Sequence, residues 1–478
     1  MFKKFQWLLL AVLLAGGFAV RLYKIDNPVA DWHSWRQADT SAVTRNYFKY
    51  GISLFYPRYD DLSDVSGKGL LNPRGYRFVE FPVFNLVHYF LAKVFPFKPL
   101  EFWGRMAAIL SSLVSAVILF LLVRRKTKSL TGLLAAFFYL FLPYNIYFTR
   151  VILPDPLMVT FFLAALNFFD LWLIKQKSFL VILTGISGAL AVLVKPVAVF
   201  FFLPMLWQVY QKYGWSFFKQ KMLWILGFAI VFPFLAWRLW SYLHPEGVPA
   251  SAWLLNGDHI RFKGAFFRWI FGERIGKLIL GAWGVLLLGM GLIFGSGYFA
   301  AWMLAALTYL SVFATGNVRH DYYQIPIIPA ISVLLALGVA YLVRKSRDFR
   351  ETWTKRILAL VCTGFMLAFS WYDIKGDYQV NHWEIVAAGK EVDKITPKDA
   401  IVVAPYDGDT AFLYQTNRAG FAYIPFPVKD LIDRMHVTYY VSVNYDEQTN
   451  AIMKKYTVIE QNPRFVIVKL IEPKKPAK

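Results

Sequence analysis

The residues best suited to chemistry gather in one short stretch that follows the first long apolar run of the chain. Ten residues hold two carboxylates, an arginine, a histidine and two tryptophans in a protein that is 57% hydrophobic: Asp31-Trp32-His33-Ser34-Trp35-Arg36-Gln37-Ala38-Asp39-Thr40. Carboxylates beside cations are groups that handle anionic substrates. An ordinary loop at a membrane surface can also carry tryptophans at the headgroup level and charges in water. Later residues must decide between the two interpretations.

More charged residues recur at the borders of later apolar runs, several of them beside a proline. They are Glu80, Arg105, Arg150, Asp155, Lys195 and the run Arg319-His320-Asp321-Tyr322-Tyr323. Charged groups at membrane depth are costly and tend to be functional. Non-helical backbone at that depth is tolerated where it is buried in protein or lines a cavity. Together, these carboxylates and cations indicate a site for an anionic substrate.

Most of these residues also have a structural alternative. Asp155 precedes Pro156 and could cap the start of a helix. Lys195 could extend its amine to the membrane interface, Arg105 could anchor a helix there, and His320 could be a loop histidine. Glu80 is harder to explain in this way, because its neighbours in Phe78-Val79-Glu80-Phe81-Pro82 are mostly apolar.

Composition indicates a membrane protein with many spans and a smaller water-soluble part. The chain has 478 residues, 18% aromatics and a net charge of +22, and its mean hydropathy is +0.44. The basic residues stand in short clusters between apolar runs, which favours control of membrane orientation over nucleic-acid binding. The single cysteine, Cys362, excludes a disulfide framework or a cysteine metal site within one chain.

The apolar runs predict a polytopic α-helical protein with about eleven spans, since a spanning helix needs roughly 20 apolar residues. The expected spans are 6–21, 104–123, 130–148, 156–174, 179–194, 196–211, 222–241, 277–294, 299–315, 325–343 and 356–372. Basic clusters in alternate loops place the amino terminus in the cytoplasm and the carboxyl terminus outside the plasma (inner) membrane.

This topology puts the unusual polar motifs on the outer face of the membrane. The outer segments are the loop of residues 22–101, the turn 150–155, the loop 242–276 and the segment 316–323. Within the first outer loop, residues 40–51 have helical spacing of apolar residues, and residues 81–95 resemble an interfacial helix.

The composition changes after Tyr372, so we expect residues 1–372 to form the membrane domain and 373–478 a small outer α/β domain. A helix is expected at 383–395, a strand at 400–404, a helical turn at 430–435 and further short segments at 412–414, 439–443 and 465–470. Asp407-Gly408-Asp409 is interpreted as a turn in preference to a metal or sugar loop.

These motifs carry a resemblance to a known family. The first outer loop with Asp39 resembles that of polyprenyl-phosphate-dependent glycosyltransferases with the GT-C fold, which include protein O-mannosyltransferases and aminoarabinose transferases. Over residues 1–345 the similarity rests on a short set of features: Glu80 before an aromatic-proline helix, Gly104-Arg105, Asp155-Pro156, Lys195 and Tyr322-Tyr323 followed by Pro326 and Pro329. Many relatives have an adjacent acidic pair where this chain has Asp39-Thr40, so a second carboxylate would have to come from Asp31 or Glu80.

The resemblance implies an inverting transfer on the outer face from an undecaprenyl- or dolichyl-phosphate sugar to a lipid, glycan or protein acceptor. A phosphate departs without a proton, so one base suffices; Asp39 is the candidate and Asp31 the runner-up. The candidate donor-binding residues are Arg36, His33, Glu80, Arg105, Asp155, Lys195, His320, Tyr322 and Tyr323. A divalent metal on Glu80 and Asp155 is left open, since no spacing signature supports it.

Two other classes of function compete with an enzyme. A transporter or flippase of lipid-linked sugars would typically show repeated halves and interrupted helices at the bilayer midplane. The chain has no evident repeat and a long outer loop instead. A non-catalytic protein of polysaccharide assembly is the second rival, with the outer domain as its working part.

Overall fold

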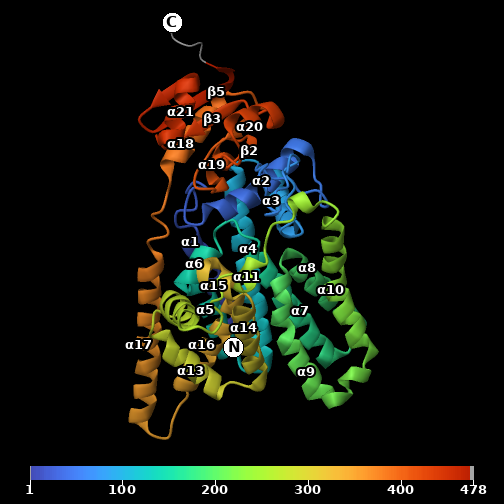
Figure 1. Ribbon diagram of the computed structural model, residues 1–478. Helices are drawn as coiled ribbons and strands as arrows, with labels where there is room; N and C mark the ends of the chain where they lie inside the picture. Colours follow the sequence, from blue (N-terminus) through green and yellow to red (C-terminus); the bar gives the residue numbers. More distant parts are fainter. Residues whose placement is uncertain (1, 474–478) are drawn as a thin grey trace. The chain divides into compact units, whose positions relative to one another are not determined.

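The computed structural model describes residues 2–473, which form two compact units. The first unit contains residues 1–25, 105–237 and 251–376, and the second contains residues 26–104, 238–250 and 377–478. The second unit thus joins the first outer loop to the carboxyl-terminal segment. Figure 1 shows the elements along the chain.

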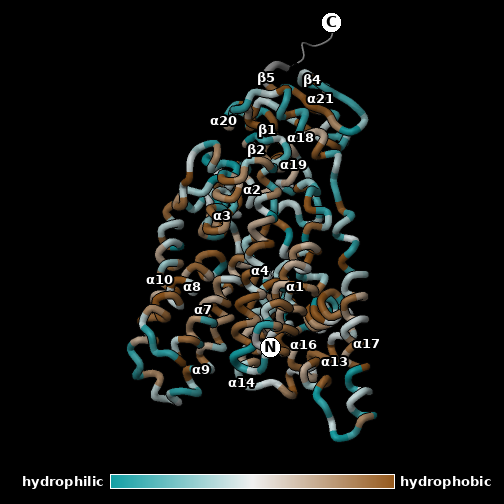
Figure 2. The backbone as a smooth tube through the Cα atoms, turned by 180° about the vertical axis from the view of Figure 1, so that it is seen from behind, coloured by the Kyte–Doolittle hydropathy of each residue, from teal (hydrophilic) through white to brown (hydrophobic). Residues whose placement is uncertain are grey.

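The first unit is built from helices. Its elements are α1 (Phe2–Arg21), α4 (Leu100–Lys126), α5 (Ser129–Phe141), α6 (Pro143–Phe148), α7 (Asp155–Lys175), α8 (Ser178–Val194), η1 (Pro196–Phe202), α9 (Leu203–Tyr213), η2 (Gly214–Lys219), α10 (Lys221–Ser241), α11 (Trp253–Asn256), α12 (Gly264–Phe267), the π-helix η4 (Arg268–Ile279), α13 (Gly284–Phe294), α14 (Gly297–Val312), α15 (Ala314–Arg319), η5 (Asp321–Ile327), α16 (Ile328–Leu342) and α17 (Phe349–Ile374). Helices α4 and α10 extend into the second unit by their outer ends. Figure 2 shows mostly hydrophobic colouring along these helices.

The prediction of a polytopic helical membrane protein is confirmed. Among residues 2–473, six helices are long and apolar enough to cross a bilayer: Lys4–Arg21, Leu100–Lys126, Asp155–Lys175, Lys221–Ser241, Asp321–Leu342 and Phe349–Ile374. A seventh span results if the pair Gly264–Ile279 and Gly284–Phe294, bent by 108°, is counted as one. The predicted number of eleven is not confirmed.

Breaks in the helices account for two of the expected spans, whereas α8 and α14, with 17 and 16 residues, are unbroken but shorter apolar helices. The expected span 130–148 is divided at Pro143 into α5 and α6, and the expected span 196–211 consists of the 3₁₀-helix η1 followed by α9. Pro196 and Pro204 lie at the first turns of these two elements, where a missing N–H costs little. Hydropathy identifies apolar runs but not the places where proline ends a helix.

Helices α13 and α16 approach each other unusually closely through glycine. A Cβ built on Gly291 would lie 1.9 Å from the carbonyl oxygen of Leu334, and one on Gly338 would lie 2.1 Å from that of Leu287. Small residues allow such backbone approach between membrane helices, where packing replaces the hydrophobic effect as the driving force.

The second unit contains a five-stranded sheet and surrounding helices. Its elements are α2 (Ser34–Tyr50), α3 (Val83–Val94), η3 (Pro245–Gly247), α18 (Trp383–Ile395), β1 (Ile401–Val403), α19 (Thr410–Gln415), β2 (Ala419–Phe421), α20 (Val428–Met435), β3 (Tyr439–Ser442), α21 (Glu447–Lys455), β4 (Tyr456–Asn462) and β5 (Phe465–Pro473). The strand order is β2-β1-β3-β5-β4. β1 is parallel to β2 and β3, whereas β5 is antiparallel to β3 and β4.

The first outer loop attaches to the free edge of β2. The Leu62 N–H donates to the Gly420 carbonyl at 2.8 Å, and the Gly420 N–H donates to the Asp60 carbonyl at 2.9 Å. The Leu62 side chain belongs to the core between the sheet and its helices. Pairing covers an edge that would otherwise expose backbone groups, and it fixes α2 beside α19 (Figure 1).

Most elements of this unit were predicted, but η3, β2, α21 and β4 were not. α2 begins at Ser34, not near residue 40, so Arg36 and Asp39 stand on a helix and not in a loop. Residues 412–414 lie in α19, which begins because the Asp409 side chain accepts from the Ala411 N–H at 2.7 Å. Such a cap favours a helix over another strand.

Replacing Gly291 by alanine is expected to destabilise the first unit. The added methyl group meets the backbone of Leu334 and has to push α16 away, which typically costs about 1–3 kcal/mol. Thermal unfolding of the purified protein in detergent measures the effect. Gly289→Ala on the same helix is the control, because a Cβ there has nothing within 4 Å. Equal melting temperatures for the two variants would contradict the close approach.

Candidate active site

Helix α2 places Arg36 and Asp39 one turn apart, on the same face of the helix. The Arg36 side chain is 4% exposed and its Nη2 donates to both carboxylate oxygens of Glu80, at 2.5 and 2.7 Å. The Glu80 carboxylate compensates a guanidinium that burial has removed from water. Two of the predicted site residues, Arg36 and Glu80, therefore come together, although 44 residues separate them in the sequence.

Asp39 is held from both sides by residues that sequence reasoning did not select. The Arg77 Nη2 lies 2.5 Å from its Oδ2, and the Thr410 hydroxyl donates to its Oδ1 at 2.7 Å. Thr410 is the first residue of α19, so the carboxyl-terminal segment contributes directly to this carboxylate. Asp39 itself is 3% exposed.

Burial and the neighbouring cations act on the pKa of Asp39 in opposite directions. Burial raises the pKa of Asp39 above its ordinary value, although Arg77, Thr410 and Arg36 act to lower it. Burial also raises the pKa of Asp61 to about 6 and that of Asp409 to about 6, and the charge of Asp39 adds to both effects. The negative charge of Asp39 thus raises the pKa of two neighbouring carboxylates.

Asp31 and His33 lie at the start of α2. The Gln37 side chain donates to Asp31 Oδ1 at 2.6 Å, and the Ser34 N–H donates to the Asp31 carbonyl at 3.1 Å. His33 immediately precedes the helix with a left-handed φ of 55°, and its ring lies 4.7 Å from that of Trp32. Both residues shape the beginning of the helix that carries Asp39.

A second cluster lies in the first unit and contains most of the remaining predicted residues. The Lys195 Nζ lies 2.8 Å from both oxygens of Asp155. The same ammonium lies 5.7 Å from the ring centre of Tyr322 and 5.5 Å from that of Tyr323. The His320 ring stacks on Tyr323 at 5.6 Å. These five residues, which come from three distant segments, therefore form one cluster.

Arg105 and Arg150 have a different environment. Arg105 Nη1 donates to the Ile25 carbonyl at 2.5 Å, and Arg150 Nη1 donates to the carbonyls of Tyr23 and Lys24 at 3.2 and 2.6 Å. Both guanidiniums are almost fully buried. These hydrogen bonds fix the chain where it leaves α1, and the role of Arg105 in donor binding stays a prediction.

Metal ligation remains open in the sequence but finds no cluster in the structure. Among residues 2–473, no group of three or more His, Cys, Asp or Glu side chains is arranged to hold a metal ion. Glu80 is paired with Arg36 and Asp155 with Lys195, so both carboxylates already face a cation. No step of the reaction is assigned to a metal here.

The sequence around Arg77 and Thr410 contains little that would mark either residue as part of the site. Arg77 ends a loop rich in Gly, Pro, Asp and Arg, in which no single residue stands out. Thr410 directly follows Asp407-Gly408-Asp409, which was interpreted as a turn. That interpretation describes the backbone, since Asp407 and Gly408 have positive φ, but it does not reveal that the next residue reaches Asp39.

Replacing Glu80 by leucine is expected to lower the free energy of unfolding by about 3–5 kcal/mol, because Arg36 then keeps a buried charge without its carboxylate. The double variant Arg36→Met/Glu80→Leu should recover most of this loss. Thermal or denaturant unfolding of the three proteins measures the difference. A double variant no more stable than Glu80→Leu would argue against the ion pair as the cause.

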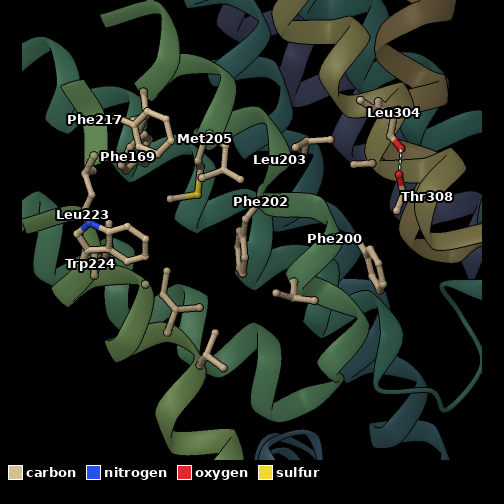
Figure 3. A pocket seen from close by; sticks show the side chains of 18 residues that line it. Phe169, Phe200, Phe202, Leu203, Met205, Phe217, Leu223, Trp224, Leu304 and Thr308 are labelled. Atoms are coloured by element: carbon tan, nitrogen blue, oxygen red, sulfur yellow. Dashed lines mark hydrogen bonds between the residues drawn. The ribbon is translucent and has the colours of Figure 1, made fainter. Parts of the chain in front are cut away.

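An apolar cavity of about 630 Å³ lies within the first unit between α7, α9, α10 and α14. Figure 3 shows Phe202, Met205 and Trp224 among the side chains that line it, while the Thr308 hydroxyl donates to the Leu304 carbonyl at its edge. The lining is almost entirely hydrocarbon and aromatic, so the cavity suits an apolar chain.

A family comparison supports the resemblance seen in the sequence. Residues 80–240 match the model described as dolichyl-phosphate-mannose-protein mannosyltransferase. The matched region includes Glu80, Arg105, Asp155 and Lys195. A search of curated proteins finds no match.

Solved structures show the same fold over nearly the whole chain. ArnT from Cupriavidus metallidurans bound to undecaprenyl phosphate is 12% identical, with 96% of this chain and 97% of ArnT covered and a TM-score of 0.69. The Archaeoglobus fulgidus oligosaccharyltransferase in its apo form is 11% identical, covering 91% and 69%, with a TM-score of 0.56. The mycobacterial arabinofuranosyltransferase AftD is 13% identical, covering 96% of this chain and 41% of AftD, with a TM-score of 0.52.

The predicted fold is thus confirmed by the solved structures, and the family match over residues 80–240 supports the predicted class of enzyme. The chain is a multi-pass membrane protein with the fold of the GT-C glycosyltransferases.

Proposed function

We propose that this protein transfers a single sugar from a polyprenyl-phosphate donor to an acceptor hydroxyl on the outer face of the plasma membrane. The matched family model is described as dolichyl-phosphate-mannose-protein mannosyltransferase, and the fold neighbours include ArnT bound to undecaprenyl phosphate and an oligosaccharyltransferase. The observation that carries the proposal is Asp39, a buried carboxylate held between an arginine and a hydroxyl on a rigid helix. The basic clusters in alternate loops support the outer location.

Asp39 acts as the general base. The acceptor oxygen attacks the anomeric carbon, Asp39 takes the hydroxyl proton, and the bond between that carbon and the phosphate oxygen breaks. A carboxylate has about four lone-pair positions, so contacts with Arg77 and Thr410 leave room for the acceptor hydroxyl. A pKa raised by burial makes Asp39 a stronger base than an exposed aspartate.

Cations receive the charge that develops on the departing phosphate. Lys195 is the leading candidate, because its ammonium is held by Asp155 and by two tyrosine faces. Such preorganisation stabilises a developing anion without reorganisation during the reaction. Arg36 and His320 are further candidates. We assign the prenyl chain of the donor to the apolar cavity, whose lining fits hydrocarbon (Figure 3).

The space beside Asp39 is small. The cavity between Arg36, Asp39, Arg77 and Glu80 measures about 10 Å³, which is room for about one water molecule. An acceptor therefore reaches Asp39 after the segment around Arg77 or Glu80 moves aside. A base enclosed in this way is protected from water until the acceptor arrives.

Asp39→Asn is expected to reduce sugar transfer about 100-fold or more, because the amide cannot take the proton. Purified protein is incubated with polyprenyl-phosphate sugars, and loss of sugar from the carrier is followed by mass spectrometry. Asp433→Asn, which changes an exposed carboxylate on α20, is the control and should retain full activity. Normal transfer by a well-folded Asp39→Asn protein would exclude Asp39 as the base.

Thr410→Val tests the role of α19 through the pH dependence of transfer. The Asp39 carboxylate is active above its pKa and loses activity as the pH falls through that value. The Thr410 hydrogen bond lowers this pKa, so its removal should shift the acid limb of the rate profile to higher pH. The control is Thr416→Val at the end of the same helix, whose hydroxyl donates to Leu413. A profile that does not move would show that Thr410 does not tune Asp39.

A further inference from the structure

A second polar cavity lies in the second unit, at the carboxyl end of α2. It measures about 330 Å³ and is unassigned by the chemistry described above. Its wall carries several tyrosines and two arginines, chiefly Tyr50, Tyr56, Arg58, Arg74, Tyr76 and His244. No acidic residue is among the described residues that line it. Gly51 at its edge has a φ of +85° and open space at its Cβ position.

The aromatic residues of the cavity include a buried tyrosine, Tyr76, and two exposed ones, Tyr50 and Tyr56. Tyr76 is buried, with its ring 5.6 Å from Tyr56 and 5.5 Å from His244. Tyr56 is 38% exposed and Tyr50 is 69% exposed. Aromatic faces pair with the apolar C–H faces of sugar rings, while the phenol hydroxyl offers a hydrogen bond.

The two arginines give the cavity a positive charge. The Arg58 and Arg74 guanidiniums lie 5.7 and 5.9 Å from the ring centre of Tyr76, and Arg74 Nη1 donates to the Tyr76 hydroxyl at 3.1 Å. Both side chains are exposed. Glu246 lies near Arg74 but outside the lining, and it faces His244 at 3.8 Å. Two planar guanidiniums beside an aromatic floor fit a carboxylate or phosphate carried on a sugar.

The tyrosine cavity and the small space beside Asp39 are separate, but residues of the same helix, α2, line both. Arg36, Asp39, Val43, Asn46 and Tyr50 follow one another at spacings of three and four residues, which places them in one stripe of α2. The first three line the small space beside the base, and the last two line the tyrosine cavity. Asp39 and Tyr50 are eleven residue steps apart on α2, which corresponds to about 16 Å at a rise of about 1.5 Å per step.

The segment opposite α2 also lines both spaces, because the adjacent residues Arg77 and Tyr76 line one space each. Arg77 contacts Asp39, while its neighbour Tyr76 forms the floor of the cavity. The short antiparallel bridge between Arg58 and Tyr76 joins the two segments. A chain molecule lying along α2 would thus contact the cavity with one end and Asp39 with the other.

We propose that this cavity is an acceptor subsite for a sugar that carries a negative charge, so that the acceptor is an acidic glycan or glycolipid. The role of the cavity as an acceptor subsite rests on the proposed transfer reaction. The binding of a charged sugar depends on the residues of the cavity alone. Tyr50 and Tyr56 hold the sugar ring, and Arg58 and Arg74 bind its carboxylate or phosphate.

Binding of model compounds to the purified full-length protein tests the proposal. The probes are oligogalacturonate as an acidic glycan, a maltooligosaccharide as a neutral one, and short-chain phosphatidylglycerol as an anionic lipid without sugar, each titrated calorimetrically in neutral detergent. We expect oligogalacturonate to bind more tightly than the neutral sugar. Arg58→Gln/Arg74→Gln should weaken its binding about tenfold or more, since charged hydrogen bonds are lost.

Two controls separate this site from general charge effects. Arg434→Gln removes an exposed arginine on α20 and should leave binding unchanged. Tyr50→Phe should retain binding, whereas Tyr50→Ala should weaken it. Equal affinity for both glycans, equal weakening by Arg434→Gln, or arginine-dependent binding of the phospholipid alone would overturn the proposal.

Failure of the subsite proposal and failure of the proposed reaction give different experimental results. Asp39→Asn protein should bind oligogalacturonate as the unaltered protein does, because Asp39 lies outside the cavity. If transfer proves absent while the arginine-dependent binding persists, the transfer reaction is wrong and the acidic-glycan site stands. If transfer depends on Asp39 but the arginine pair has no effect on binding, the subsite is wrong and the reaction stands.

Discussion

The second unit depends on how the buried charge of Asp39 is compensated. A carboxylate removed from water needs cations and hydrogen-bond donors nearby, or it becomes neutral. Arg77 and Thr410 supply them from opposite ends of the chain, one from the first outer loop and one from the carboxyl-terminal segment. The contact therefore has two consequences at once. It tunes the proposed base, and it requires the loop to pack on the small sheet, where Leu62 and Gly420 pair.

Buried ion pairs recur wherever the chain carries a predicted functional charge. Arg36 faces Glu80 and Lys195 faces Asp155, each pair almost free of solvent. Such pairs contribute little net stability compared with apolar residues, yet removing one partner is costly. This asymmetry explains why a membrane protein can keep them: they fix side chains in place for chemistry more than they stabilise the fold. Arg105 and Arg150, bound to backbone carbonyls, fix the chain instead.

Composition and hydropathy predicted the membrane-protein class, the helices of the first outer loop and most elements of the carboxyl-terminal segment. They did not predict helix breaks such as Pro143, because an apolar run looks the same whether or not it bends. Charge placement selected candidate residues but did not indicate how they pair. Arg36 and Glu80, or Lys195 and Tyr323, stood out as polar residues at apolar borders, but their partnership arises from tertiary packing. Thr410 carries no charge and so gave no such signal.

The hydrogen bond from Thr410 to Asp39 brings the carboxyl-terminal segment into direct contact with the proposed base. Viewed from the sequence, residues 373–478 are a separable α/β domain with an unknown role. In the structure, their helix α19 touches the proposed base, and their strand β2 holds the loop that carries Arg77's neighbours. Movement of that loop would change the contacts of Asp39 and the space beside it together. The carboxyl-terminal segment therefore shapes the surroundings of Asp39 in two ways, directly through Thr410 and indirectly through the loop that β2 holds.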